Sequence, residues 1–375
     1  MATKSAVQFG AGSIGRGFVA QILHASGYDV TFADVDDEII AKLQSTPSYH
    51  VREVGEEPRT SIVDGYRAIN SRTHEDEVVA AIANADIVTT AVGEHILQFI
   101  APAIALGLRA RSDKRNNLTV IACEAGGTDI LAAEVRKHAP AHNAVFANCA
   151  IDRIVPEQEG GLDVTIESYF EWAVERAPFK GNLPDIAGAT WVDDLAPHIE
   201  RTLFTVRAAE AAAAYRGHDR GRVSIRDALA TAELQAEIRA MLTETMALLV
   251  AKQAFDPHEQ RAFIEKTIAR ISNPQLPDTC ERVGRNPMRK LSRIERFIGP
   301  AAQLAELGLP TRNLLGAVAA ALRFDVRSDE ESIDLQELLN SGLSADELAA
   351  RITGLSSSDP LYPDVVDVIE ARLNR

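Results

Sequence analysis

The stretch "VQFGAGSIGRG" near the N-terminus constrains the fold more than any other part of the sequence. It places Gly10, Gly12 and Gly15 in a GxGxxG pattern between an apolar, strand-like segment and a helix-like one. The first glycine permits a tight turn, the second admits a pyrophosphate to the backbone, and the third lets helix and strand pack closely. The following helix presents N–H groups and its positive dipole end to phosphates. The pattern predicts a dinucleotide site, with a ligand-free glycine turn as the alternative.

An acidic residue supports the dinucleotide prediction and indicates which cofactor is bound. The next strand-like segment, "YDVTFAD", ends with Asp34, about 20 residues downstream of the glycines. A carboxylate at this position accepts hydrogen bonds from the adenosine ribose hydroxyls. Because a carboxylate repels a 2′-phosphate, NAD is favoured over NADP. The expected cofactor contacts follow the carboxyl ends of several strands, and they are Phe9, Gly10, Ala11, Gly12, Ser13, Ile14, Gly15, Asp34, Ala91, Val92 and Glu124.

The order of apolar segments predicts the fold class. Strand and helix patterns alternate over the first 150 residues, and the continuous apolar runs "ADIVTTAV" and "NLTVIACE" are typical of buried parallel strands. From about residue 195 the chain is predominantly helical. We therefore expect an α/β protein: a Rossmann-like doubly wound NAD-binding domain over 1–194 and a mainly α-helical substrate-binding domain over 195–375. The intervening "LDVTIESYFEWAVERAPFKG" adds strands to the sheet or covers its edge.

Composition limits the kinds of partner that we expect the chain to bind. A formal charge of -15 argues against a general nucleic-acid or membrane-surface binder, but it allows a small anionic substrate in a local basic pocket. The three cysteines are far apart and form no CxxC, so neither a metal site nor a disulfide framework is expected. We find no signal-peptide pattern and no apolar run of membrane-spanning length, and the cytoplasm is the simplest compartment.

With the glycine loop, Asp34 and "DIVTTAVG" established, the chain resembles the mannitol-1-phosphate 5-dehydrogenases of the polyol-specific long-chain dehydrogenase/reductase family. The likeness covers nearly the whole length and includes "AIDRIVP", "EWAVERAPFKG", "ERVGRNPMRKLS" and "GLPTRNLLGAVAAAL". The resemblance implies metal-independent hydride transfer between NAD and a polyol or polyol phosphate. It also implies a substrate site between two domains and a monomer or weak homo-oligomer.

The resemblance breaks at the catalytic motif. Relatives typically have "ERKLFTxNxxHAxxAY", in which the lysine is the general acid/base, the asparagine polarises the substrate oxygen and the histidine orients the substrate. The present chain has "ERTLFTVRAAEAAAAY", so Thr202, Arg207 and Glu210 occupy those positions within a matching frame. Asn148 matches a further asparagine that stabilises the oxyanion in some members, and it is the best surviving polariser. Ala125 replaces an asparagine that relatives often carry near the nicotinamide.

The residue types at the three positions differ chemically from those of the relatives. A threonine hydroxyl does not accept a proton as a buried lysine does, and an arginine stays protonated but binds a carboxylate or phosphate by its fork of donors. Glu210 could act as a base in principle, and His198, one turn before Thr202, is an alternative.

Three hypotheses follow from this change. The first is an NAD-binding enzyme with a rebuilt catalytic centre, acting on a small anionic polyol or sugar phosphate, phosphonate or carboxylate. The alternatives are a catalytically inactive NAD-binding scaffold or regulator, and a residual polyol-phosphate dehydrogenase. Substrate contacts are expected from Asp152, Arg153, Lys180 and Lys290.

Overall fold

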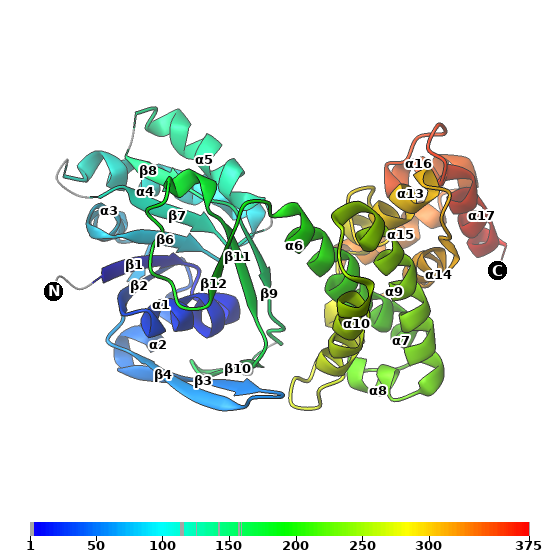
Figure 1. Cartoon of the computed structure of the whole chain (residues 1–375), viewed down its shortest axis with the longest axis horizontal. Coiled ribbons are helices and arrows are strands. Elements are labelled where there is room, and N and C mark those ends of the chain that lie inside the picture. The colour runs from blue at the N-terminus through cyan, green and yellow to red at the C-terminus, as the bar shows by residue number, and fades with distance from the viewer. Residues whose placement is uncertain are drawn as a thin grey trace. The chain divides into compact units, whose positions relative to one another are not determined.

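The computed structural model describes residues 4–112, 116–124, 126–141, 143–156, 158 and 160–374. The chain divides into two compact units, Met1–Ile199 and Glu200–Arg375. All of the strands shown in Figure 1 belong to the first unit, and the second unit is built from helices. The predicted boundary after residue 194 lies close to the observed division.

A six-stranded parallel sheet forms the centre of the N-terminal unit. Its strand order is β5-β2-β1-β6-β7-β8, and every pairing within it is parallel. The direction of strand addition reverses between β1 and β6, which is where open α/β sheets bind ligands. The doubly wound fold predicted from the sequence is therefore confirmed. The strands are β1 (Lys4–Phe9), β2 (Tyr28–Asp34), β5 (Arg67–Asn70), β6 (Ile87–Thr90), β7 (Leu118–Ala122) and β8 (Ala144–Phe146).

Apolar residues cover both faces of this sheet. Because successive side chains of a strand point to opposite faces, Val7 and Phe9 of β1 belong to one hydrophobic core and Ala6 belongs to the other. The second core also contains Phe18 and Trp172. The flanking helical segments are η1 (Gly15–Ala20), α1 (Gln21–Ala25), α2 (Asp37–Ser45), α3 (Glu75–Asn84), η2 (Glu94–Ile96), α4 (Leu97–Ala110) and α5 (Gly127–His138).

Two small three-stranded sheets accompany the central one. Their orders are β10-β3-β4 and β12-β11-β9. The segment "AVFANCAIDRIVP" is divided between two sheets: it forms β8 in the central sheet and β9 in a small sheet, separated by Ala147 and Asn148. The strands are β3 (Ser48–Val54), β4 (Arg59–Asp64), β9 (Cys149–Asp152), β10 (Val164–Glu167), β11 (Glu171–Glu175) and β12 (Ala189–Val192), with the short helix η3 (Ala177–Phe179).

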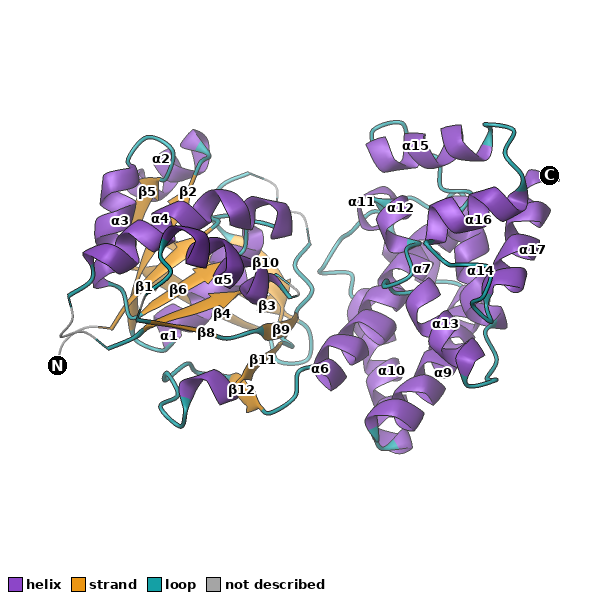
Figure 2. Cartoon of the chain, turned by 90° about the horizontal axis from the view of Figure 1, so that it is seen from above, coloured by secondary structure: helices purple, strands orange, loops and turns teal. Residues whose placement is uncertain are grey.

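The C-terminal unit packs its helices around α7, as the purple ribbons of Figure 2 show. The alanines of α7 are fully buried, and Tyr215 at its centre contacts the rings of Phe297 and Phe324. The helices are α6 (Ala196–Arg201), η4 (Thr202–Arg207), α7 (Ala208–Asp219), α8 (Ile225–Leu229), α9 (Ala232–Gln253), α10 (Pro257–Ile271), α11 (Cys280–Gly284), α12 (Pro287–Lys290), α13 (Ile298–Glu306), α14 (Arg312–Ala321), α15 (Glu330–Leu339), α16 (Ala345–Thr353) and α17 (Tyr362–Leu373).

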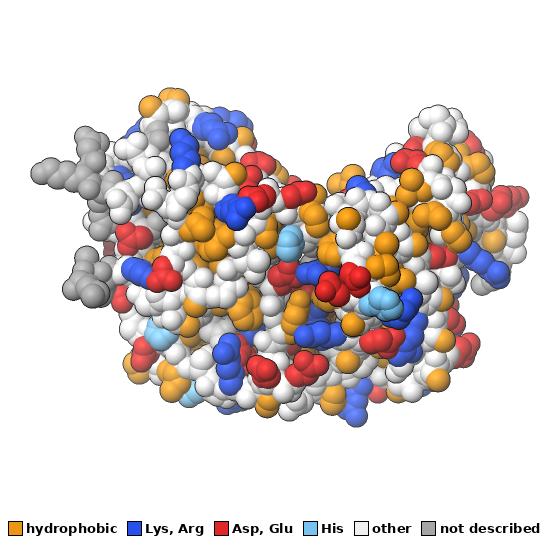
Figure 3. Space-filling model, in the orientation of Figure 1, with side chains coloured by type: hydrophobic (Ala, Val, Ile, Leu, Met, Phe, Trp, Pro, Cys, Tyr) orange, Lys and Arg blue, Asp and Glu red, His pale blue; other side chains and the backbone are white. Residues whose placement is uncertain are grey.

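Charged side chains of both signs are interspersed on the face shown in Figure 3. Oppositely charged side chains pair within the C-terminal unit, including Arg323 with Asp219 at 2.7 Å and Arg220 with Glu237 at 2.6 Å. Within the described residues, no helix has the length and apolar character needed to cross a membrane.

Candidate active site

The glycine loop leads from β1 into η1, and its three glycines have different surroundings. Gly10 has a φ of 89°, and a Cβ there would lie 2.4 Å from the carbonyl oxygen of Ala91. A Cβ on Gly15 would lie 1.9 Å from the carbonyl oxygen of Gly10. At Gly12, in contrast, no atom lies within 4 Å of the Cβ position. Gly12 therefore leaves open space beside the loop, which fits the predicted approach of a phosphate.

A helix begins immediately behind this space. Ser13 is half-buried and Ile14 is exposed, and the turns of η1 are the wide turns of a π-helix. The first N–H groups of a helix have no acceptor within the helix, so they are available to an anion. Wide helical turns occur frequently at functional sites. The loop and helix start are thus compatible with the phosphate site that the pattern predicts, and this site stays a prediction.

Asp34 lies beside the glycine loop at the carboxyl end of β2. Its Oδ2 accepts a hydrogen bond from the Ala11 N–H at 2.6 Å, and its Oδ1 accepts one from the Asp36 N–H at 3.1 Å. The carboxylate is only partly buried. This position next to the loop fits the adenosine ribose of a dinucleotide, as the sequence predicts for Asp34.

Main-chain contacts join the loops that follow β1 and β6. The carbonyl oxygen of Phe9 accepts a hydrogen bond from the Ala91 N–H at 2.8 Å. The Phe9 side chain is buried in the core below the sheet, 1% exposed. Phe9 and Ala91 therefore contribute backbone to the edge where the cofactor is expected, and they fix the distance between the two loops.

Glu124, which follows β7, holds the loop after β6. Its Oε1 accepts hydrogen bonds from the N–H groups of Val92 at 2.7 Å and Gly93 at 3.1 Å, and its Oε2 accepts one from the Thr90 hydroxyl. These donors occupy the carboxylate, so the geometry gives Glu124 the role of shaping the loop around Val92. The neighbouring Ala125 lies outside the described residues.

Asn148 lies between β8 and β9 and is oriented by α5. Its Nδ2 donates a hydrogen bond to Asp129 Oδ2 at 3.0 Å, whereas its Oδ1 is a buried atom without a partner among the described residues. Buried amide oxygens normally have a donor. Asn148 therefore retains unused hydrogen-bonding capacity at the carboxyl edge of the sheet.

Arg153 is held entirely by the N-terminal unit. Its guanidinium forms a buried ion pair with Glu53, donates from Nη1 to Gln21 Oε1 at 3.0 Å, and lies between the rings of Phe18 and Phe170. Burial lowers the pKa of Arg153 to about 9. Because these contacts use its donors, we leave Arg153 out of the proposed substrate contacts.

The other two predicted substrate residues of this unit lie in different surroundings. Asp152 is 1% exposed, at the end of β9. Lys180 is exposed and follows η3 in a left-handed conformation with a φ of 51°. Lys180 thus remains available for an anion, whereas a substrate contact by Asp152 would require its side chain to become accessible.

The altered motif forms a continuous helical segment through α6, η4 and α7. Thr202 begins the π-helical turns of η4, and Arg207 ends them. Arg207 Nη1 lies 3.0 Å from Glu210 Oε2, and these side chains are 34% and 16% exposed. Thr205, on the same turns, is buried and accepts a hydrogen bond from Gln260 of α10 at 3.1 Å. The altered positions therefore lie on a helix with wide turns that is anchored on its buried side.

A buried lysine lies near this helix within the C-terminal unit. Lys290 is 5% exposed, and its Nζ donates to the carbonyl oxygens of Val283, at 2.6 Å, and Arg285. Burial, together with the positive charges of Arg296 and Arg289, lowers the pKa of Lys290 to about 7, and the carboxylates of Glu295 and Glu210 act in the opposite direction. Sequence spacing does not indicate the proximity of Lys290 and Glu210, because the helices α8 to α11 lie between them along the chain.

His198 is already paired. Its Nδ1 contacts the Glu171 carboxylate within the N-terminal unit. A carboxylate partner holds an imidazole in one orientation. Among the described residues, no group of three His, Cys, Asp or Glu side chains could hold a metal ion.

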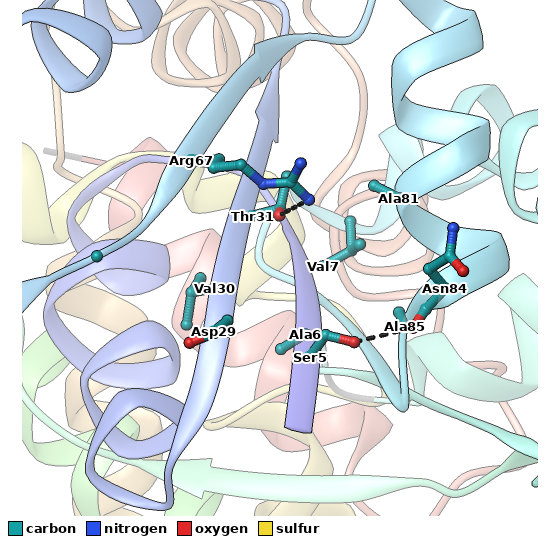
Figure 4. Close-up of a pocket in the computed structure, with 11 residues that line it drawn as sticks. Ser5, Ala6, Val7, Asp29, Val30, Thr31, Arg67, Ala81, Asn84 and Ala85 are labelled. Carbon is teal, nitrogen blue, oxygen red and sulfur yellow. Dashed lines mark hydrogen bonds between the residues drawn. The ribbon is translucent and has the colours of Figure 1, made fainter. Parts of the chain in front are cut away.

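A cavity of about 270 Å³ lies toward the amino-terminal ends of the strands of the central sheet. The glycine loop lies at the other end, where β1 finishes. The cavity is lined by the amino-terminal parts of β1 and β2, by Arg67 and by the end of α3 at Asn84 (Figure 4). Arg67 Nη2 donates to Thr31 Oγ1 at 3.2 Å across it. Open α/β sheets bind ligands at the carboxyl ends of their strands, so this cavity is not the cofactor site.

Comparisons with known proteins agree with the architecture. The model of the mannitol dehydrogenase Rossmann domain matches residues 4–188, and that of the mannitol dehydrogenase C-terminal domain matches residues 194–354. A mannitol-1-phosphate 5-dehydrogenase of Pseudarthrobacter chlorophenolicus is 52% identical over 377 residues, covering 98% of this chain and 97% of the relative. One of Aspergillus clavatus is 51% identical over 381 residues, with 98% and 97% coverage.

Two solved structures share the fold. Pseudomonas fluorescens mannitol 2-dehydrogenase, solved as a ternary complex with NAD and D-mannitol, has a TM-score of 0.75 at 16% identity and covers 99% of this chain and 91% of its own. A D-sorbitol dehydrogenase solved in substrate-free form has a TM-score of 0.73 at 15% identity, with 97% and 92% coverage. Because both family models match and relatives share about half of the residues over nearly the full length, the chain belongs to the mannitol dehydrogenase family of oxidoreductases.

Proposed function

We propose that this chain is an NAD-dependent oxidoreductase with a rebuilt catalytic centre, acting on a small anionic polyol or sugar phosphate, phosphonate or carboxylate. The observation that carries the proposal is the altered motif on an intact frame. The helix around Thr202 is anchored through Thr205 to Gln260, while Arg207 and Glu210 form an ion pair at positions where the resemblance gives the relatives an amide and an imidazole.

The N-terminal unit fits NAD. The open space at Gly12 and the helix start at Ser13 suit the diphosphate, and Asp34 suits the adenosine ribose. When bound, NAD supplies a hydride acceptor. The backbone at Ala91 and Val92, which Glu124 holds in place, forms the neighbouring wall, and Asn148 offers an amide at the same sheet edge.

The positive charges of the C-terminal unit support an anionic substrate. Arg207 remains protonated at any physiological pH, and its guanidinium suits carboxylate or phosphate oxygens. Glu210 offsets part of this charge and fixes the side chain. Arg207 replaces the neutral amide of the relatives with a cationic group, which favours a substrate of greater negative charge than a free polyol.

Oxidation of an alcohol also releases the hydroxyl proton, which needs an acceptor in place of the missing lysine. We propose Lys290 for this step. A neutral amine has two N–H donors and one lone pair, and the two carbonyl oxygens of Val283 and Arg285 take both donors. The lone pair is then left to accept a proton, and a pKa of about 7 leaves a large share of the amine neutral at physiological pH.

Binding and turnover measurements test this function. We expect calorimetry to show NAD binding with a preference over NADP. We expect oxidation of anionic polyols with NAD, tested first with mannitol 1-phosphate and in reverse with fructose 6-phosphate and NADH. Lys290→Met is expected to reduce turnover while leaving NAD affinity unchanged. Absence of NAD binding would rule out both enzyme hypotheses.

A second candidate is mannitol-1-phosphate 5-dehydrogenase activity itself, and the 52% identity to a protein of that name favours it. Turnover of mannitol 1-phosphate at an ordinary rate of about 10 per second would support this candidate. Tight NAD binding without turnover of any anionic polyol would instead support a catalytically inactive scaffold.

A further inference from the structure

Arg16, which directly follows the glycine loop, is a buried cation that forms no salt bridge with the described residues. The residue is 4% exposed. Its Nε donates to the carbonyl oxygen of Leu162 at 3.1 Å, and its Nη1 donates to the carbonyl oxygen of Ala11. Within the described part of the chain, Arg16 forms no salt bridge, and its third nitrogen, Nη2, has no hydrogen-bond partner. Nη2 is not fully buried, so it remains in contact with solvent.

A second buried arginine shows how unusual this is. Arg153 is equally buried in the same unit, but it pairs with the carboxylate of Glu53. Buried charges in proteins are normally paired, because the desolvation of an isolated charge costs free energy. The charge of Arg16 is therefore retained at a cost to the free protein, which suggests a partner that arrives with a ligand.

The position of Arg16 identifies the kind of ligand. The peptide unit of Ala11 is held at both ends, because Asp34 accepts its N–H and Arg16 donates to its carbonyl oxygen. Asp34 also acts electrostatically on the Arg16 guanidinium. A diphosphate bound at Gly12 would bring further negative charge beside the Asp34 carboxylate. A cation at Arg16 offsets that repulsion.

We propose that Arg16 is a cofactor-positioning residue, whose guanidinium fixes the Ala11 peptide and supplies the positive charge against which the diphosphate of a dinucleotide binds. This inference rests on the proposed function, since it requires the loop to bind NAD. The glycine pattern alone does not assign any role to Arg16, the residue after the third glycine.

The test compares ligands with and without the diphosphate. Affinities of the full chain for NAD and ADP are measured by calorimetry, and that for adenosine by ligand-observed NMR, in the wild type, R16Q and R16K. R153K is the matched control, because it alters another buried arginine of the same unit. We expect R16Q to weaken NAD and ADP about tenfold or more and adenosine by less than about twofold. R153K is expected to affect all three ligands equally.

The salt dependence gives a second readout. Log Kd for NAD should rise less steeply with salt in R16Q than in the wild type, and R16K, which keeps the charge, should retain the wild-type slope. If R16Q does not fold, an R16K slope equal to that of the wild type supports the proposal, and a changed slope contradicts it. Equal ADP affinity in R16Q and the wild type, or equal losses for ADP and adenosine, overturn the proposal. Failure of the wild type to bind NAD instead refutes the proposed function.

Discussion

Arg207 and Glu210 form an ion pair one turn apart, with Arg207 Nη1 3.0 Å from Glu210 Oε2. The two residues lie at and just beyond the end of the π-helical turns that begin at Thr202. The opposite charges of the two side chains compensate each other, so the residues at positions 207 and 210 are compatible with one another. A partly exposed pair of this kind contributes only about 0–1 kcal/mol to stability. Changes at these positions should therefore act on chemistry more than on folding.

Restoring the motif of the relatives tests that expectation. The triple variant T202K/R207N/E210H should gain mannitol 1-phosphate oxidation by about tenfold or more, because a lysine at 202 supplies a proton acceptor within an unchanged frame. The measurement is the rate of NADH formation at saturating NAD. R207N/E210H, which lacks the lysine, is the matched control. A control variant that gains as much as the triple variant would contradict the role given to position 202.

Lys290 should make stability depend on pH in a defined window. The folded-state pKa is about 7, below the ordinary value of 10.5. Below pH 7 the amine is charged in both the folded and the unfolded chain, so it adds no pH dependence to the free energy of unfolding. Between the two pKa values the unfolded chain binds one more proton, so the free energy of unfolding rises with pH, by up to about 1.4 kcal/mol per pH unit. The stabilisation is complete above the unfolded pKa and is lost as the pH falls through the folded pKa.

The measurement is urea unfolding of the wild type and K290M at steps of about one pH unit across this window. The difference between the two proteins should rise with pH, because other titrating groups contribute equally to both. K290M also removes the bonds to Val283 and Arg285, but that loss does not depend on pH within the window. Parallel curves would show that Lys290 stays charged in the folded chain.

Residues for the cofactor half of the site can be proposed from the sequence, because they are close together along the chain. Gly10 to Gly15 and Asp34 belong to one strand-turn-helix-strand unit whose spacing has a direct geometric meaning. Arg153 is assigned to the substrate site because the resemblance makes its segment a wall of that site, whereas its partner Glu53 lies on another strand far along the chain. Lys290 and Glu210 were likewise not connected by spacing. Contacts between distant segments depend on packing that no local pattern encodes.

The buried pair of Arg153 and Glu53 should be a strong determinant of stability. Both side chains are at most 1% exposed, so R153M leaves Glu53 with Arg59 as its remaining cationic partner and should cost about 3–5 kcal/mol. R59M is the matched control, because Arg59 is 64% exposed and should cost less. Denaturant unfolding of both variants checks the order. A larger loss in R59M than in R153M would contradict the assignment.

Substitutions at Gly12 and Gly15 distinguish an effect on ligand binding from an effect on folding. A Cβ at Gly12 enters open space, so G12A should leave the stability of the free protein within about 1 kcal/mol of the wild type. The same methyl group would occupy the space proposed for a phosphate, and we expect NAD affinity to fall about tenfold or more. A Cβ at Gly15 would lie 1.9 Å from the Gly10 carbonyl oxygen, so G15A must displace the loop and should lose both stability and binding. Thermal unfolding with and without NAD distinguishes the two outcomes: G12A should keep the wild-type Tm without NAD but show a reduced shift with it, and G15A should unfold at a lower temperature in both conditions. An NAD-induced shift in G12A equal to that of the wild type would show that the cofactor does not approach the backbone at Gly12.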